Sequence, residues 1–101
     1  MISHTIEKTV AERKTLTLDA SGLCPSGVAV STCAVSAIAR STLAADNTVI
    51  VDTAPTPSGN TVDVTLYQGS DGESYLVNAA FTLDNNDVKE VYILLNVLNV
   101  P

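Results

Sequence analysis

Apolar and polar residues alternate along most of the chain in short stretches, which is the period-two pattern of a strand that buries one face. Turn-forming Gly, Pro, Asn, Asp and Ser separate these stretches. The pattern predicts an all-β chain of six to seven antiparallel strands, with strands at 14–19, 28–38, 47–53, 61–67, 74–83 and 89–97. Regular short strands favour a sandwich or a small barrel, and they leave no room for the crossover helices of a βαβ fold.

One stretch has two interpretations. The alternation of 28–38 continues as a strand, but the alanines and the leucine of 34–45 also suit a short helix. The pattern leaves this choice open. The stretch 54–60 is clearer, because Pro55 and Pro57 exclude it from a central ladder of hydrogen bonds.

The most specific local pattern is the passage from Leu66 to Val77, where a strand enters a Gly/Asp turn and a new strand begins with a tyrosine. The spacing of Asp71, Tyr75 and Val77 follows the corner motif of immunoglobulin-like sandwiches, in which the tyrosine ties down the preceding turn. Val77 occupies the position that a disulfide cysteine usually takes. We therefore expect an immunoglobulin-like β-sandwich whose sheets are held by packing.

The two ends of the chain are candidates for contacts with other proteins. Residues 1–13 place three apolar side chains at helical spacing before the first strand, so we expect an N-terminal arm that projects from a sandwich at 14–101. The last residues are almost all apolar, and a closing strand at a sheet edge would offer unpaired amides to a neighbour. The expected partner-binding residues are Ile2, Ile6, Val10, Leu98 and Val100.

Charge and composition narrow the classes of partner. The 101-residue chain carries a net charge of −6, with +1 in residues 1–45 and −7 in residues 46–101. A basic face is needed to bind nucleic acid or an anionic membrane, so we expect neither partner. No apolar run reaches the roughly 20 residues that span a bilayer, and the N-terminus does not resemble a signal peptide. We expect a soluble protein that stays in the compartment where it is made.

Candidate chemistry is sparse. His4 is the single histidine, so no nucleophile–base pair is expected, and the acidic pairs lie in turns rather than in a cleft. The spacing of Cys24 and Cys33 fits neither a zinc site nor a redox motif. They are expected to be free thiols, with a disulfide as the alternative if their Cα atoms lie within about 7 Å. We predict no catalytic, metal-binding or cofactor-binding residue.

Taken in order, these segments resemble the small immunoglobulin-like virion proteins of tailed bacteriophages, of the fibre–tail adaptor type. The resemblance covers roughly residues 12–97 and rests on a succession of features. These are Leu-Thr-Leu-Asp at 16–19, a Ser/Ala/Val strand at 28–38, Thr-Val-Ile-Val at 48–51, and Val-Asp-Val-Thr-Leu at 62–66 before the Gly-Ser-Asp-Gly-Glu-Ser-Tyr passage.

The resemblance implies a non-enzymatic structural subunit made in the bacterial host cytoplasm and built into the virion. Its partners would be other virion proteins, namely fibre, neck, tail or capsid subunits, with several copies in a symmetric assembly or a homo-oligomer. A capsid decoration protein is the alternative role within the same class. A module that recognises cell-surface glycans through Tyr67 or Tyr92 is the alternative from a different class.

Overall fold

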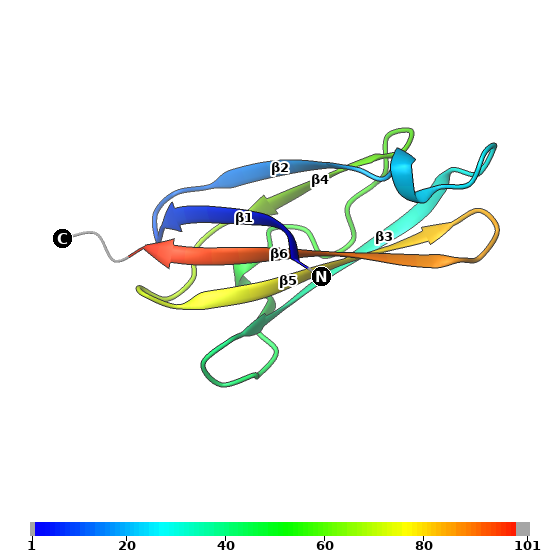
Figure 1. Ribbon diagram of the computed structural model, residues 1–101. Coiled ribbons are helices and arrows are strands. Elements are labelled where there is room, and N and C mark those ends of the chain that lie inside the picture. The colour runs from blue at the N-terminus through cyan, green and yellow to red at the C-terminus, as the bar shows by residue number, and fades with distance from the viewer. Residues whose placement is uncertain (1, 99–101) are drawn as a thin grey trace.

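The computed structural model describes residues 2–98 and contains six β-strands with two short 3₁₀ turns (Figure 1). The all-β prediction is confirmed, since no α-helix occurs in this part of the chain. The strands are β1 (Ile2–Thr9), β2 (Lys14–Asp19), β3 (Val30–Ala39), β4 (Thr61–Leu66), β5 (Ser74–Leu83) and β6 (Val88–Leu98). The 3₁₀ turns are η1 (Ser21–Leu23) and η2 (Asn47–Val49).

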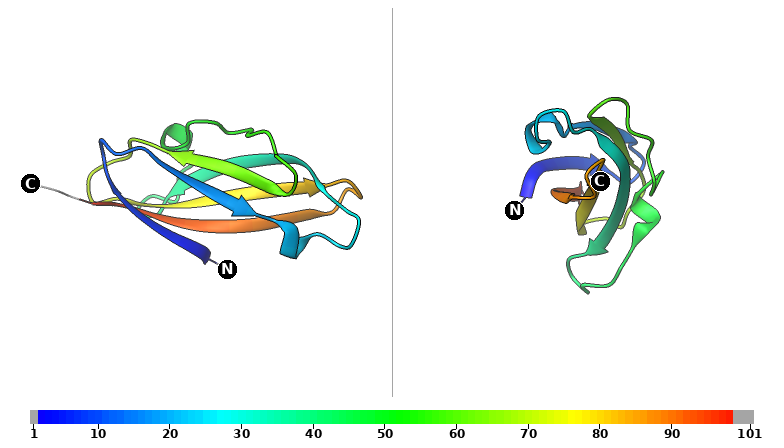
Figure 2. Two further views of the ribbon diagram at one scale, coloured as in Figure 1. Left: turned by 90° about the horizontal axis from the view of Figure 1, so that it is seen from above. Right: turned by 90° about the vertical axis from the view of Figure 1, so that its right-hand side faces the viewer.

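The strands form two sheets that lie one over the other. The larger sheet has the order β1-β6-β5-β3, and the smaller sheet pairs β2 with β4. The end-on view in Figure 2 shows the two layers, and the molecule is elongated along the strands, with extents of 49 × 23 × 19 Å. The arrangement is that of a two-layer sandwich.

The core between the sheets is aliphatic, as the alternating pattern predicts. In β5, every second residue from Tyr75 to Leu83 is buried, and the residues between them are half-buried on the outer face. Val62, Val64 and Leu66 of β4 close the core from the other sheet. Since a buried aliphatic side chain contributes about 1.5–3 kcal/mol, this packing supplies most of the stabilisation.

The prediction of a projecting arm at 1–13 is wrong for the described part of that segment. Residues 2–9 form β1, which pairs with β6 in parallel, with Ile6 beside Leu95. The sheets are therefore not wholly antiparallel. The pairing also places β6 between β1 and β5. Ile93, Leu95 and Val97 of β6 are buried in the core, and the residues between them are half-buried on the outer face. Because β6 has a neighbour on each side, the condition for its pairing with another chain, a place at a sheet edge, is not met.

The predicted strand at 47–53 is also wrong. Asp46 accepts a hydrogen bond from the Thr48 amide at 3.1 Å and so starts the η2 turn. The Asn47 side chain accepts a bond from the Ala37 amide at 2.9 Å, where a strand would have used its backbone. Side chains of this kind compete with a regular ladder. Residues 46–53 instead cross from the edge of β3 to the edge of β4, and we call them the crossing segment.

The open choice at 34–45 is resolved in favour of a strand. β3 continues through Ala39, and the chain then turns, with Leu43 at a φ of 57°. The alternation that begins at 28–38 is the stronger signal because Cys33, Val35 and Ala37 face the core.

Cys24 and Cys33 are both free thiols. Cys33 is buried in β3, and this burial raises the pKa of its thiol to about 11. A protonated, buried thiol reacts slowly, because the thiolate is the nucleophile.

We expect a disulfide reagent at pH 8 to modify Cys24 of the folded protein and to leave Cys33 untouched, giving one labelled thiol per chain by mass spectrometry. A Cys24→Ser variant should take no label until denaturant is added. The unfolded chain loses the Cys33 proton near pH 9 and the folded protein near pH 11, so Cys33 also makes the free energy of unfolding fall across that range. Rapid labelling of folded Cys24→Ser would contradict the assignment.

Candidate functional site

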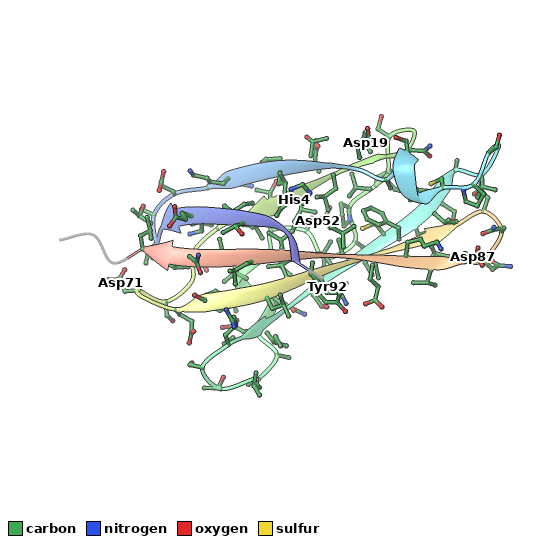
Figure 3. The ribbon with its side chains drawn as sticks, viewed as in Figure 1. His4, Asp19, Asp52, Asp71, Asp87 and Tyr92 are labelled. Atoms are coloured by element: carbon green, nitrogen blue, oxygen red, sulfur yellow. The ribbon has the colours of Figure 1, made fainter. Side chains whose placement is uncertain are left out.

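The strongest candidate for a partner site is the end of the sandwich where the β1–β2 turn, the β4–β5 loop and the end of β6 meet. We call this the corner end and define it as residues 9–13, 67–73 and 97–98. Figure 3 shows Asp71 at this end, close to where β6 finishes, and Asp87 at the opposite end. Its backbone is held by three interactions, each described in turn.

The first interaction is the hydrogen bond between Tyr75 and the β4–β5 loop. Tyr75 is buried at the start of β5, and its hydroxyl accepts a hydrogen bond from the Ser70 amide at 2.9 Å. The bond reaches the residue before Asp71, which itself lies exposed in the loop. Val77, two residues further along β5, is fully buried in the core. Tyr75 thus fixes the loop from inside the sandwich.

We expect Tyr75→Phe to lower the free energy of unfolding by about 1 kcal/mol, because the part-buried Ser70 amide loses its partner. Tyr92→Phe is the matched control, since the Tyr92 hydroxyl donates to the exposed Glu90 carboxylate. Urea denaturation of both variants measures the difference. Equal stabilities of the two variants would contradict a structural role for the Tyr75 hydroxyl.

The second interaction is a close approach of the loop to the core. Gly69 has a φ of 101°, which favours glycine, and it lies directly over Val97 and Tyr75. A Cβ atom at this position would sit 2.8 Å from Val97 Cγ2 and 3.3 Å from Tyr75 Cε2. The loop can therefore lie this close to β6 only without a side chain.

The third interaction is a buried lysine. The Lys8 side chain is fully buried, and its ammonium donates to the carbonyl of Thr9 at 2.7 Å, to that of Val10 at 3.4 Å, and to that of Gln68. Burial lowers the pKa of Lys8, and the carboxylate of Glu12 opposes this effect. The three bonds join the β1–β2 turn to the β4–β5 loop, so one side chain holds together segments 60 residues apart.

Three large apolar side chains are exposed on this fixed backbone. Val10 is 37% exposed, Tyr67 37% and Leu98 40%. Leu98 pairs with Thr9, next to Val10, and the carbonyls of Val10 and Gln68 share the Lys8 ammonium. The guanidinium of Arg13 lies 5.8 Å from the centre of the Tyr67 ring. The corner end thus exposes three apolar side chains on neighbouring backbone segments, with a cation beside one of them, and we call Val10, Tyr67 and Leu98 the apolar triad.

The five residues expected to bind partners do not form one surface. Val10 and Leu98 come together at the corner end, but Ile6 packs against the core and is not free for a partner. Ile2 begins β1, about 23 Å from Thr9 at the strand's usual rise, and its side chain lies outside the described part of the structure. Val100 also lies outside the described residues.

Sequence reasoning missed Lys8, Gly69 and the role of Tyr67 at the corner end. Read with a period of two instead of a helical period, β1 would have placed Lys8 on the same face as Ile6, which was the available signal. Tyr67 follows the last residue of β4, and the sequence indicated a role for it only in the alternative of glycan binding.

The two tyrosines proposed for glycan binding lie apart in the fold. Tyr67 follows β4 of the smaller sheet, whereas Tyr92 lies on the outer face of the larger sheet (Figure 3), beside a hollow of about 150 Å³. A second hollow of about 360 Å³ on the smaller sheet is lined by threonines, Asp52 and Asp63, with no aromatic ring. Neither arrangement gathers aromatic faces into a sugar platform.

Within residues 2–98, no three His, Cys, Asp or Glu side chains gather closely enough to hold a metal ion. None of the helices in this described range is long and apolar enough to cross a membrane. Comparison of the chain with protein-family models, with curated proteins and with solved structures found no match.

Proposed function

We propose that the chain is a non-enzymatic structural protein of a tailed-bacteriophage virion, an immunoglobulin-like domain that links a fibre, neck or tail component to the particle. It is made in the host cytoplasm and acts in several copies, with other virion proteins as partners and with neither nucleic acid nor membrane. The resemblance of the segments from 12 to 97 is the starting point for this proposal.

The order of the strands supports the immunoglobulin-like part. β2 and β4 correspond to strands B and E of such a domain, and β3, β5 and β6 correspond to C, F and G. Tyr75 then stands near the start of strand F, two residues before the cysteine position that Val77 takes. The loop that Tyr75 holds is the corresponding E–F corner.

The observation that carries the linking role is the apolar triad on a fixed backbone. Exposed apolar side chains that gather at one end of a domain are candidate contact sites for other proteins. A site built on a rigid frame loses little conformational entropy on binding, and repeated copies in a ring convert a weak contact into firm attachment. The corner end combines exposed apolar side chains with a fixed backbone, which supports the linking role.

Mass spectrometry and electron microscopy of purified virions, from the phage whose genome encodes the chain, test the proposal. We expect the protein in several copies at the fibre, neck or tail. Density spread over the whole head would support the capsid decoration role instead, and absence of the protein from virions would overturn the proposal.

A pair of variants tests the surface itself. Val10→Asp with Leu98→Asp should fold and yet be lost from particles, because two charges replace the apolar contact. Val88→Asp is the matched control, since Val88 is 57% exposed at the other end of β6. Equal incorporation of both variants would contradict the assignment of the corner end.

A further inference from the structure

The two sheets have four edges, and two of these are covered by the chain itself. The crossing segment bonds to β3, with the Val35 amide donating to the Thr53 carbonyl at 2.8 Å. The same segment bonds to the end of β4, with the Val51 amide donating to the Thr65 carbonyl at 3.0 Å. These backbone bonds occupy the groups that a foreign strand would need. The end-on view in Figure 2 shows this closed side opposite β1.

The edge of β1 is open but guarded. Its register with β6 shifts between Ile2 and His4, which breaks the straight row of amides and carbonyls. Lys8 also points inward from this strand and is fully buried. A bulge and an inward charge on an edge strand are both devices that prevent edge-to-edge pairing.

The edge of β2 has neither protection. All six residues from Lys14 to Asp19 pair with β4 in an unbroken antiparallel register, without a bulge or a proline. Beyond β4, the backbone of these six residues has no hydrogen-bond partner within residues 2–98. The strand also alternates threonine and leucine, residues that suit a pleated surface. An open, unbroken edge of this kind is a template for one more strand.

The charges at the two ends of β2 favour an antiparallel partner strand with the same sequence. Basic Arg13 and Lys14 stand at one end, and acidic Asp19 stands at the other, where Figure 3 shows it beside η1. An antiparallel strand with the same sequence brings the basic end of each copy to the acidic end of the other. A parallel copy would instead place Arg13 against Arg13, and like charges directly opposite one another are destabilising.

We propose that β2 pairs with β2 of a second copy about a two-fold axis, joining the two small sheets into one four-stranded sheet. The cores of both copies must lie on the same side of the joined sheet. Core-facing residues of one β2 must therefore stand opposite core-facing residues of the other, and outward-facing residues opposite outward-facing ones. In the register with Leu16 opposite Leu16, Thr15 lies opposite Thr17 and Arg13 lies opposite Asp19. The two-fold axis makes each of these two pairs occur twice. Thr15, Thr17 and Asp19 all lie on the exposed outer face of the strand.

The contact is small. A strand of six residues offers much less than the 1,200–2,000 Å² that stable complexes usually bury. The dimer is therefore weak and concentration-dependent in solution. The inference rests on the open edge of β2 and on the charges at its two ends, including Arg13, which precedes β2 and also lies over the Tyr67 ring. It does not depend on the virion role.

Sedimentation of the full chain over a range of concentrations tests the pairing. We expect a monomer–dimer equilibrium that weakens at high salt. Arg13→Glu and Asp19→Arg should each raise the dissociation constant at least about tenfold, because each opposes like charges twice. An equimolar mixture of these two variants should dimerise again, because each substituted position then faces an opposite charge on the other chain. The double variant, with both charges exchanged, should dimerise for the same reason.

Two control variants test whether the change in dimerisation comes from any change of surface charge or from a loss of folding stability. Glu7→Arg changes an exposed charge on the guarded β1 edge and should leave the equilibrium unchanged. Asp19→Ala removes the carboxylate that accepts a hydrogen bond from the Ser21 amide and so measures the loss of that bond, which should leave folding intact. A wild-type chain that stays monomeric at every concentration, or a mixture of the two charge variants that fails to associate, would overturn the proposal.

Discussion

Replacing Gly69 with alanine is expected to lower the free energy of unfolding by about 3 kcal/mol. Two costs add at this position. A φ of 101° strains any residue other than glycine by about 1–3 kcal/mol. The new Cβ would also lie 2.8 Å from Val97 Cγ2, and overpacking of this kind costs about 1–3 kcal/mol.

Thermal and urea denaturation measure the loss, which corresponds to a melting temperature lower by about 12–24 °C for a domain of this size. Gly59→Ala is the matched control, because Gly59 also has a positive φ, of 62°, but no atom lies within 4 Å of the position of its Cβ. The control should lose only the smaller conformational cost.

A second substitution separates the two costs at Gly69. Val97→Ala removes the methyl group that the new Cβ would meet, so adding Gly69→Ala to this variant should cost less than adding it to the wild type. The difference is a coupling energy between neighbours in contact. Strictly additive effects would contradict the contact, and a Gly69→Ala variant as stable as Gly59→Ala would contradict both arguments.

More of the fold than of the candidate site could be predicted from the sequence, because strands follow from a local pattern and contacts such as that of Gly69 do not. β2, β4 and β5 follow from alternation alone, because in each strand the residues that face the core are more buried than those between them. β1 does not, because its inward positions include Lys8, a charge where the pattern requires an apolar residue. The crossing segment was predicted as a strand for a related reason. The side chains of Asp46 and Asn47 accept hydrogen bonds from backbone amides, and these bonds take the place of the backbone bonds of a regular strand pair.

The corner end was predicted in part. Tyr75 could be identified because its position relative to a turn and a strand is a local feature. Gly69 and Lys8 could not, because their roles depend on neighbours that are distant in sequence, Val97 in one case and the Gln68 carbonyl in the other. The sequence placed Val10 in a projecting N-terminal arm and Leu98 at the opposite end of the chain, but the parallel pairing of β1 with β6 brings them together.

Lys8 is expected to be the side chain on which the attachment of β1 depends most. Lys8→Met keeps the apolar stem and removes the ammonium, leaving the carbonyls of Thr9, Val10 and Gln68 without this donor. A buried polar group that loses its partner costs about 1–3 kcal/mol, and the variant no longer has to bury a charge, which offsets part of the loss. We expect the free energy of unfolding to fall by about 3 kcal/mol.

The loss should also be local, which distinguishes an anchor from general destabilisation. β1 has one neighbouring strand, β6, so without Lys8 its amides should exchange with solvent faster while those of β5, between β6 and β3, keep their protection. Lys14→Met is the matched control, because Lys14 is exposed at the start of β2 and should change stability by less than about 0.5 kcal/mol. If Lys8→Met left β1 as protected as in the wild type, the three carbonyl bonds would not be what holds the first strand, and the corner end would owe its rigidity to Gly69 and Tyr75 alone.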